Sequence, residues 1–277
     1  MVWAAATVVG LFGLLIGSFL NVVVYRVPLR KSIVSPPSAC PHCGTRIRAY
    51  DNLPVLSWVL LQGKCRSCRS GISIRYPLVE LGTALLFGMV TWWWISTSSI
   101  SVGSSPTQIA TFALTLVAYL YLAAISVALT LIDLDTHTLP NRIVLPSYVV
   151  GIALLGSAAI IGSNYSAIFM AGLGLVVLWV SYLAMALVYP GGMGLGDVKL
   201  AGVLGLFLGW VGWAPLVVGA FGAFLLGGVF SIVLLLTGRA TRTSGIPFGP
   251  WMIAGAWVGL FFGNTISSGY LSLFGLE

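Results

Sequence analysis

The sequence contains little charge. Only 7% of its 277 residues are Asp, Glu, Lys or Arg, against about 25% in an average soluble domain. Acidic residues are especially few, with 6 in the chain, and there are only 2 histidines. Hydrophobic residues make up 58% of the chain, so polar groups could not cover a water-facing surface. These scarcities exclude a disordered chain, a fibrous repeat and an ordinary cytosolic enzyme. They predict a polytopic membrane protein.

The charged residues divide the chain into long apolar runs. A spanning helix needs about 20 apolar residues, and the runs at 81–132 and 143–196 can each hold two helices. No alternating pattern typical of a spanning strand is present, so we expect an all-α fold with about eight transmembrane helices. The sixth is short and rich in glycine, and is either tilted or re-entrant. The predicted spans are 3–25, 79–95, 108–132, 143–162, 167–189, 197–211, 214–237 and 250–271.

The basic residues predict the orientation. Nine of the 13 Lys and Arg lie between Arg26 and Arg75, and the others are Arg142, Lys199, Arg239 and Arg242. All 13 fall in alternate connections, which the positive-inside rule places in the cytoplasm, with both termini outside. The net charge of +7 therefore indicates membrane lipids as a partner and no nucleic acid. We expect a first transmembrane helix at 1–25, a cytoplasmic four-cysteine loop at 26–78 and a seven-helix membrane domain at 79–277.

The four cysteines form two Cys-x-x-Cys pairs in the only long polar stretch. Cys40 and Cys43 are separated by 21 residues from Cys65 and Cys68, a spacing that favours a four-thiolate zinc site. Four sulfur ligands leave no open position, so the predicted zinc is structural and His42 is a bystander. The alternatives are four buried cysteines without a metal and a redox role for one pair.

Three aspartates lie where the predicted topology places helix ends at the cytoplasmic membrane face. Asp133 and Asp135 end the third span, and Asp197 opens the sixth. Acids at membrane depth are costly and indicate function. Two neighbouring carboxylates share a proton, as aspartic proteolysis requires, and Gly194 and Gly196 would let a substrate backbone approach. The remaining acids are Asp51 and Glu277, expected to be solvated, and Glu80 at a helix end.

Other roles for these aspartates remain open. Asp133 or Asp135 could pair with Arg142 or His137, and Asp197 with Lys199. The pair could also bind a coupling ion in a transporter, although only one glycine-rich broken segment is present, whereas transporters often contain two in matching positions.

Six ordered blocks of the sequence resemble one enzyme family. Gly194-x-Gly196-Asp197 resembles the GxGD signature of intramembrane aspartyl proteases, and the wider pattern resembles the type IV prepilin peptidases, which are bifunctional leader peptidases and N-methyltransferases. The blocks are Gly17 to Pro28, the two cysteine pairs, Ile74 to Glu80, Ile132 to Asn141, Gly194 to Leu200, and Ile246 to Pro250. The chain departs from the family's frequent Asp at Asn141.

The resemblance implies both an activity and a substrate. Asp133 and Asp197 would be the catalytic pair, with Asp135 auxiliary because two helical positions turn it about 200° away. The supporting residues would be Gly194, Gly196 and Lys199, although Lys199 could instead pair with an acidic residue of the substrate. The substrates would be prepilins or pseudopilins of a pilus or secretion system, cleaved at the cytoplasmic face of the bacterial inner membrane.

The resemblance also implies methylation of the new N-terminus with S-adenosylmethionine. By family analogy that site involves the cysteine loop and its flanks. The polar candidates there are Asn21, Arg26, Arg75 and Glu80, although the two arginines could equally anchor helix ends at lipid head groups. A peptidase without methyltransferase activity, an ion-coupled transporter and a non-catalytic zinc module are the alternatives.

Overall fold

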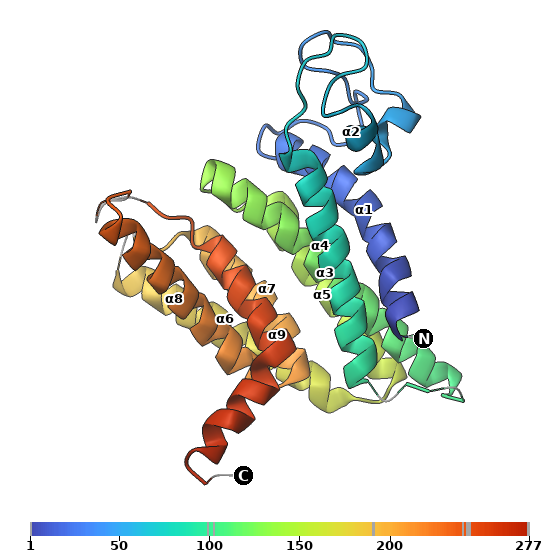
Figure 1. The fold of residues 1–277 in the computed structure, drawn as a ribbon. Coiled ribbons are helices and arrows are strands. Elements are labelled where there is room, and N and C mark those ends of the chain that lie inside the picture. Colours follow the sequence, from blue (N-terminus) through green and yellow to red (C-terminus); the bar gives the residue numbers. More distant parts are fainter. Residues whose placement is uncertain are drawn as a thin grey trace. The chain divides into compact units, whose positions relative to one another are not determined.

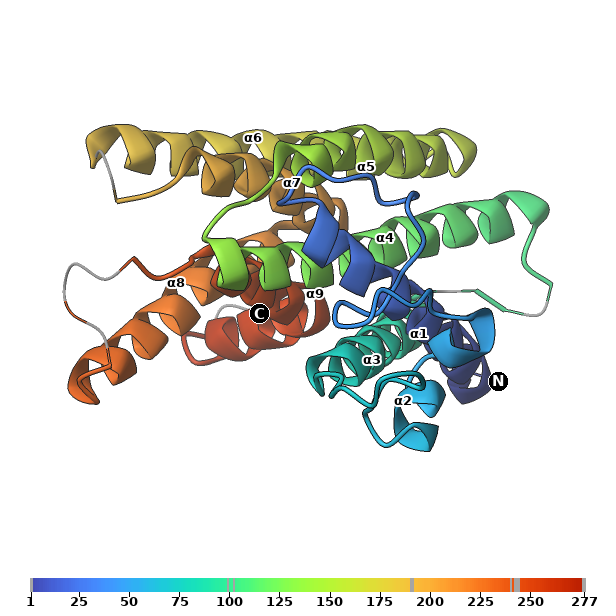
Figure 2. The ribbon, with the colours of Figure 1, turned by 90° about the horizontal axis from the view of Figure 1, so that it is seen from above.

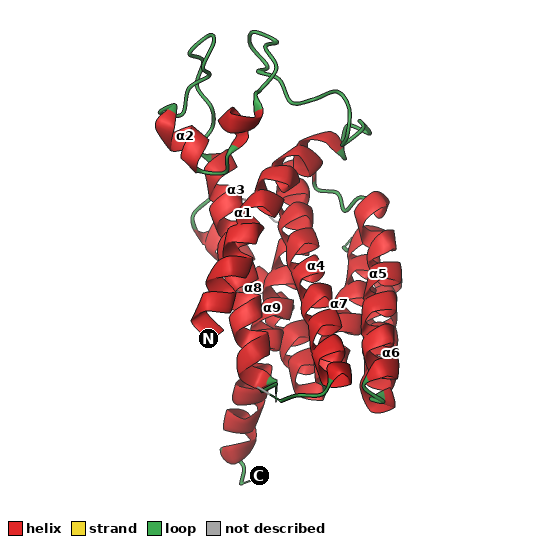
Figure 3. Cartoon of the chain, turned by 90° about the vertical axis from the view of Figure 1, so that its right-hand side faces the viewer, coloured by secondary structure: helices red, strands yellow, loops and turns green. Residues whose placement is uncertain are grey.

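A computed structural model of the chain describes residues 2–98, 100–101, 103–189, 192–239, 241 and 245–275. Arg242 and Glu277, which entered the charge analysis, lie outside these residues. The described part of the chain is helical and contains no β-strand (Figure 3). The all-α prediction is therefore confirmed.

The chain divides into two compact units, Met1–Ser99 with Tyr119–Ala128, and Ile100–Ala118 with Leu129–Glu277. In the first unit, α1 (Val2–Arg26) packs against α3 (Arg75–Thr97). Residues 27–74 connect these two helices and make up most of the cysteine loop predicted at 26–78 (Figure 1). It contains only short helices, η1 (Ala49–Asn52) and α2 (Leu56–Leu60).

The second unit contains the later helices. They are α5 (Asn141–Ile161), α6 (Tyr165–Val188), α7 (Leu195–Val211), α8 (Trp213–Leu236) and α9 (Gly249–Ser272). The long helix α4 (Pro106–Thr136) contributes residues to both units. A capping box of Ser105 and Gln108 begins α4, and His137 ends it with φ of 52°, because a left-handed residue stops helix propagation.

Glycines bring the helices together in pairs. Gly13 and Gly17 of α1 face α3, where a methyl group at Gly17 would lie 2.7 Å from Cα of Glu80. Gly174 of α6 faces Gly205 of α7. Gly255 of α9 faces α8, and these two helices lie side by side in Figure 2. Small residues allow such close backbone approach in membrane proteins, where lipid supplies no hydrophobic drive for association.

Among the residues that the structure describes, six helices are long and apolar enough to cross a membrane: α1, α3, α4, α5, α6 and α8. The chain is therefore a multi-pass membrane protein. With 17 residues, α7 is shorter than a typical span. α9 is long enough, but small and polar residues such as Asn264 and Ser267 make it less apolar. The eight helices expected from the sequence match α1 and α3 to α9 within a few residues, whereas eight membrane crossings remain a prediction.

Candidate active site and metal centre

The two cysteine pairs fold into matching turns. In the first, the N–H of Gly44 donates to the carbonyl of Cys40 at 2.9 Å; in the second, Arg69 donates to Cys65 at 3.0 Å. The fourth residue after the leading cysteine has a positive φ in both turns, 69° at Gly44 and 60° at Arg69. Each turn is also closed by an isolated antiparallel bridge. The loop is therefore built from one repeated turn.

The four sulfurs of the loop form a cluster that could hold a metal ion. One ligand atom from each of Cys40, Cys43, Cys65 and Cys68 lies within 4.8 Å of the others, and all four thiols are free. The sulfurs of Cys40 and Cys68 are 3.7 Å apart. A tetrahedral ion with metal–sulfur bonds of ~2.3 Å would separate its ligands by about 3.8 Å, so this donor set fits zinc.

The electrostatics of the cluster favour the thiolate form at Cys40 and Cys68, whereas the pKa of the Cys65 thiol is raised. Backbone N–H groups of Cys43 and His42 lower the pKa of the Cys40 thiol to about 6. The Ser70 hydroxyl, 3.1 Å from Cys68, lowers the pKa of that thiol as well. Because the thiolate is the form that binds a metal, these donors prepare the cluster for one.

Glu80 is buried and ties α3 to the loop. It is 8% exposed, and its carboxylate accepts the N–H of Val55 at 2.7 Å. Val55 has φ of 60° and ψ of −50°, and the N–H of Leu56 donates to the carbonyl of Pro54 at 2.5 Å. This is a γ-turn with positive φ, which is strained for a β-branched residue.

The other three candidates for the methyltransferase site lie at the ends of α1 and α3. Asn21 donates to the carbonyl of Tyr76 at 3.2 Å. The guanidinium of Arg26 donates to the carbonyls of Ser32 and Pro36 at 2.9 and 2.7 Å, so it orders the start of the loop. Arg75 is exposed at the first position of α3.

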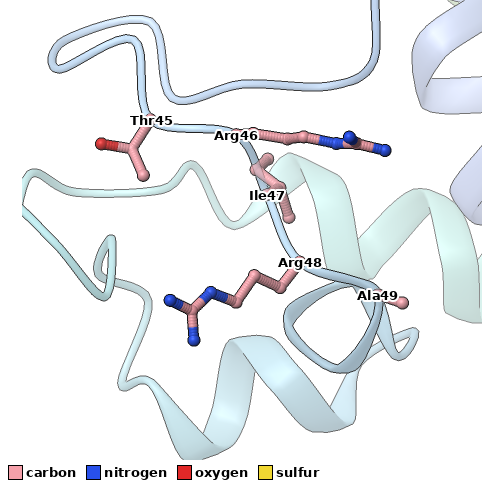
Figure 4. A pocket seen from close by; sticks show the side chains of 5 residues that line it. All are labelled: Thr45, Arg46, Ile47, Arg48 and Ala49. Carbon is pink, nitrogen blue, oxygen red and sulfur yellow. The ribbon is translucent and has the colours of Figure 1, made fainter.

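A basic segment lines a shallow hollow of about 460 Å³ on the loop, formed by residues 45–49. Figure 4 shows the side chains of Arg46 and Arg48 leaving this segment in different directions. Arg48 and Arg66 lie 5.8 and 5.5 Å from the ring centre of Tyr50. Arg66 also pairs with Asp51, whose side chain is only 11% exposed. The expectation that Asp51 is solvated was therefore wrong, because an arginine covers it.

Asp133 lies in the last turn of α4 and is 4% exposed. Its Oδ2 accepts the N–H of Gly249, the first residue of α9, at 3.1 Å. Asp135, two residues further on, is exposed. The helical spacing accordingly turns the two aspartates toward different surroundings.

Asp197 lies in the first turn of α7 and is half-buried. Its Oδ2 accepts the N–H of Gly194 at 3.2 Å, which gives the helix the acidic first-turn residue that its dipole favours. The GxGD segment therefore positions its own carboxylate.

The second unit brings the two carboxylates together. Asp133 and Asp197 are close enough to interact electrostatically. The side chain of Leu139 lies close to two glycines, Gly196 beside Asp197 and Gly249, which donates to Asp133. A methyl group at Gly196 would lie 3.1 Å from Cβ of Leu139, and one at Gly249 would lie 3.3 Å from its Cδ2. The end of α4 thus meets the beginnings of α7 and α9.

Lys199 contacts α5. Its ammonium donates to Oδ1 of Asn141 at 3.1 Å, and its carbonyl accepts the hydroxyl of Tyr148 at 2.5 Å. Asn141 is therefore a partner for Lys199.

The chain matches two family models. The Bacterial Peptidase A24 N-terminal domain matches residues 11–94, and the Type IV leader peptidase family matches residues 120–232. A prepilin leader peptidase/N-methyltransferase of Aeromonas salmonicida is 37% identical, over 98% of this chain and 95% of its own length. Proteins of the same name from Pseudomonas aeruginosa and Neisseria gonorrhoeae are 35% and 34% identical, over 96% and 92% of this chain and 93% and 89% of their own lengths. The chain belongs to the type IV leader peptidase family.

The resemblance noted in the sequence is therefore confirmed. As a member of this family, the chain is an enzyme that combines a leader peptidase with an N-methyltransferase. The match to these relatives extends over nearly the whole chain, including the cysteine loop. No solved structure matches the chain.

Sequence reasoning missed several residues around the aspartates of this leader peptidase. Gly249, Leu139 and Tyr148 make the contacts described above, and Tyr182 of α6 is buried within electrostatic range of Asp197. The Ile246 to Pro250 block contributed to the resemblance, which could have directed attention to Gly249. Nothing in the local sequence distinguishes the two tyrosines.

Proposed function

We propose that Asp133 and Asp197 form the catalytic pair that cleaves prepilins or pseudopilins after their basic leader. The observation that carries this proposal is the meeting of two acids, 64 positions apart, where one is buried and the other half-buried and each carboxylate accepts one backbone N–H. Two neighbouring carboxylates cannot both ionise easily, so a single shared proton is favoured.

The pair performs general acid–base catalysis. The ionised carboxylate takes a proton from a water molecule while the water oxygen attacks the carbonyl carbon of the scissile peptide bond. The protonated carboxyl gives its proton to the carbonyl oxygen, which completes the tetrahedral intermediate. The carboxyl that took the proton from water then gives it to the leaving amine as the C–N bond breaks, and the other carboxylate takes a proton from a hydroxyl of the intermediate. Gly194 and Gly196 leave room for an extended substrate backbone, Lys199 supports the beginning of α7, and Asp135 stays auxiliary.

We place the reaction at the cytoplasmic face of the bacterial inner membrane, with both termini outside. The distribution of Lys and Arg over alternate connections supports this orientation. The cysteine loop then lies in the cytoplasm, where its basic residues can contact anionic lipids.

The N-methylation belongs to the flanks of the cysteine loop, with Asn21, Arg26, Arg75 and Glu80 as the candidate residues. The buried carboxylate of Glu80 suits a sulfonium ligand by its charge. Bound S-adenosylmethionine would supply the methyl group for the new N-terminal amine. The four thiolates would hold a structural zinc that orders the loop, because four ligands close the coordination shell.

An in vitro assay tests the proposal. The full-length protein in detergent or liposomes is given a prepilin and labelled S-adenosylmethionine, and wild type is compared with Asp133→Asn, Asp197→Asn and Asp135→Asn. We expect cleavage to be lost in the first two variants only, and label to appear on the cleaved N-terminus in wild type.

Other outcomes point elsewhere. Normal cleavage by Asp133→Asn or Asp197→Asn would remove the proposed pair. Cleavage without label would indicate a peptidase that lacks methylation. Absence of cleavage by wild type would favour the alternative in which the two aspartates bind a coupling ion in a transporter.

A further inference from the structure

The beginning of α9 contacts the proposed catalytic pair. Pro247 and Phe248 precede the helix, and Gly249 and Pro250 are its first two residues. The N–H groups of a first helical turn have no partner within the helix. One of them, from Gly249, donates to Oδ2 of Asp133, 116 positions away in the sequence.

Because Gly249 has no side chain, the carboxylate of Asp133 can lie close to its backbone. Gly249 is buried, and a methyl group there would lie 2.7 Å from Oδ2 of Asp133, well inside van der Waals contact. The other packed glycines of α9 have a different neighbour: a methyl group at Gly255 would meet the backbone of α8, 2.6 Å from the carbonyl of Gly219. Gly249 is thus the glycine of α9 whose missing side chain admits a carboxylate.

Aromatic packing holds this segment in place. The ring of Phe248 lies 5.3 Å from that of Phe224 on α8 and 6.4 Å from that of Tyr182 on α6, measured between ring centres. A residue fixed in this way immediately before Gly249 limits the directions in which the Gly249 N–H can point.

We propose that Gly249 is a positioning residue for the peptidase reaction. Its N–H fixes one oxygen of Asp133, and its missing side chain gives that carboxylate room to face Asp197. This inference rests on the proposed function, because it assigns Gly249 a task only if Asp133 takes part in cleavage. Misplacing a reacting group by about 1 Å costs on the order of 100-fold in rate.

The test compares Gly249→Ala with two matched glycine variants in the full-length enzyme. Gly255→Ala introduces a clash into the same helix away from Asp133. Gly228→Ala on α8 adds a methyl group that has no described atom within 4 Å. We expect Gly249→Ala to lower kcat for prepilin cleavage by about 100-fold with KM changed less than about threefold. Methylation of a pre-cleaved pilin peptide should continue at the wild-type rate per folded molecule, and Gly228→Ala should resemble wild type in both reactions.

A second measurement does not depend on activity. The shift in melting temperature caused by Gly249→Ala is measured in wild type and in Asp133→Ala, which removes the carboxylate that the new methyl group would meet. We expect the shift to shrink in the Asp133→Ala background, as coupled neighbours show. An equal shift in both backgrounds, or wild-type kcat in Gly249→Ala, would overturn the inference. If Asp133→Asn and Asp197→Asn cleave normally, the proposed function fails instead.

Discussion

At the scale of single residues, one buried carboxylate holds a strained turn. Glu80 accepts the N–H of Val55, and Val55 occupies a backbone conformation that valine rarely adopts. Strain of this kind persists only where the surroundings hold it in place. The hydrogen bond from α3 to the loop therefore stabilises this conformation of the loop.

Removing the Glu80 carboxylate should loosen this part of the loop. Glu80→Ala leaves the Val55 N–H without its acceptor, at a cost of about 1–3 kcal/mol, whereas Glu80→Gln keeps an acceptor oxygen of similar reach. Hydrogen–deuterium exchange over residues 53–62 should therefore accelerate in the alanine variant and change little in the glutamine variant. Equal exchange in both variants and wild type would show that the hydrogen bond does not hold the turn.

The cysteine cluster should bind one zinc ion per chain. Cys43→Ser removes one of four ligands, so purified protein should lose most of its zinc, as measured by elemental analysis. His42→Ala is the control, because His42 lies beside Cys43 but outside the cluster of four ligand atoms. Zinc retained in Cys43→Ser, or lost in His42→Ala, would contradict the four-sulfur assignment.

A local sequence pattern identifies functional residues when both the residue types and their spacing match a known kind of site. The four cysteines could be grouped from the sequence because two short motifs encode two similar turns. Asp133 and Asp197 could be proposed because apolar runs place both at helix ends. The partner of Asp133 could not be found this way, since Gly249 lies 116 positions away and a glycine N–H has no sequence signature.

At the scale of helices, close packing depends on glycines that face one another. A methyl group at Gly174 of α6 would lie 2.5 Å from the carbonyl of Gly205 and 2.9 Å from Cα of Gly209, both on α7. Since α7 begins with the GxGD segment, its packing against α6 also sets where Asp197 lies.

Filling this contact should damage both stability and cleavage. Gly205→Ala places a methyl group against the carbonyl of Gly174, and overpacking of this kind costs about 1–3 kcal/mol. We expect a lower melting temperature and slower prepilin cleavage. Gly172→Ala on α6 is the control, because no described atom lies within 4 Å of its added methyl group. Identical melting of the two variants would rule out tight α6–α7 packing.

Helix positions could be predicted from apolar runs more accurately than helix ends. The span expected at 79–95 begins at Arg75, and the one expected at 108–132 continues to Thr136. At the end of α4, polar residues continue the helix beyond its apolar part, whereas α3 begins earlier because its first turn accommodates Pro77. The end of α4 depends on the left-handed His137, a conformation that hydropathy does not predict.

At the scale of the whole molecule, the two sets of candidate residues belong to different compact units. The four thiols, Asn21, Arg26, Arg75 and Glu80 lie in the first unit, and Asp133 and Asp197 lie in the second. The sequence predicted a loop domain and a membrane domain, but it could not show that the middle of α4 joins the first unit, because that grouping depends on packing between distant segments.

This separation predicts that either activity can be removed alone. Asp133→Asn should abolish prepilin cleavage yet still methylate a synthetic pilin peptide that already has a free N-terminus, because the thiol cluster and its flanks are unchanged. Cys43→Ser should lose methylation of that peptide, because the loop lacks its metal. Its cleavage rate should stay within about twofold of wild type, because the hydrogen bonds described for Asp133 and Asp197 lie in the second unit. Both reactions are measured on the same preparations with labelled S-adenosylmethionine. If Cys43→Ser lost both activities while remaining folded, prepilin cleavage would also depend on the cysteine loop, and the two activities would not be separable.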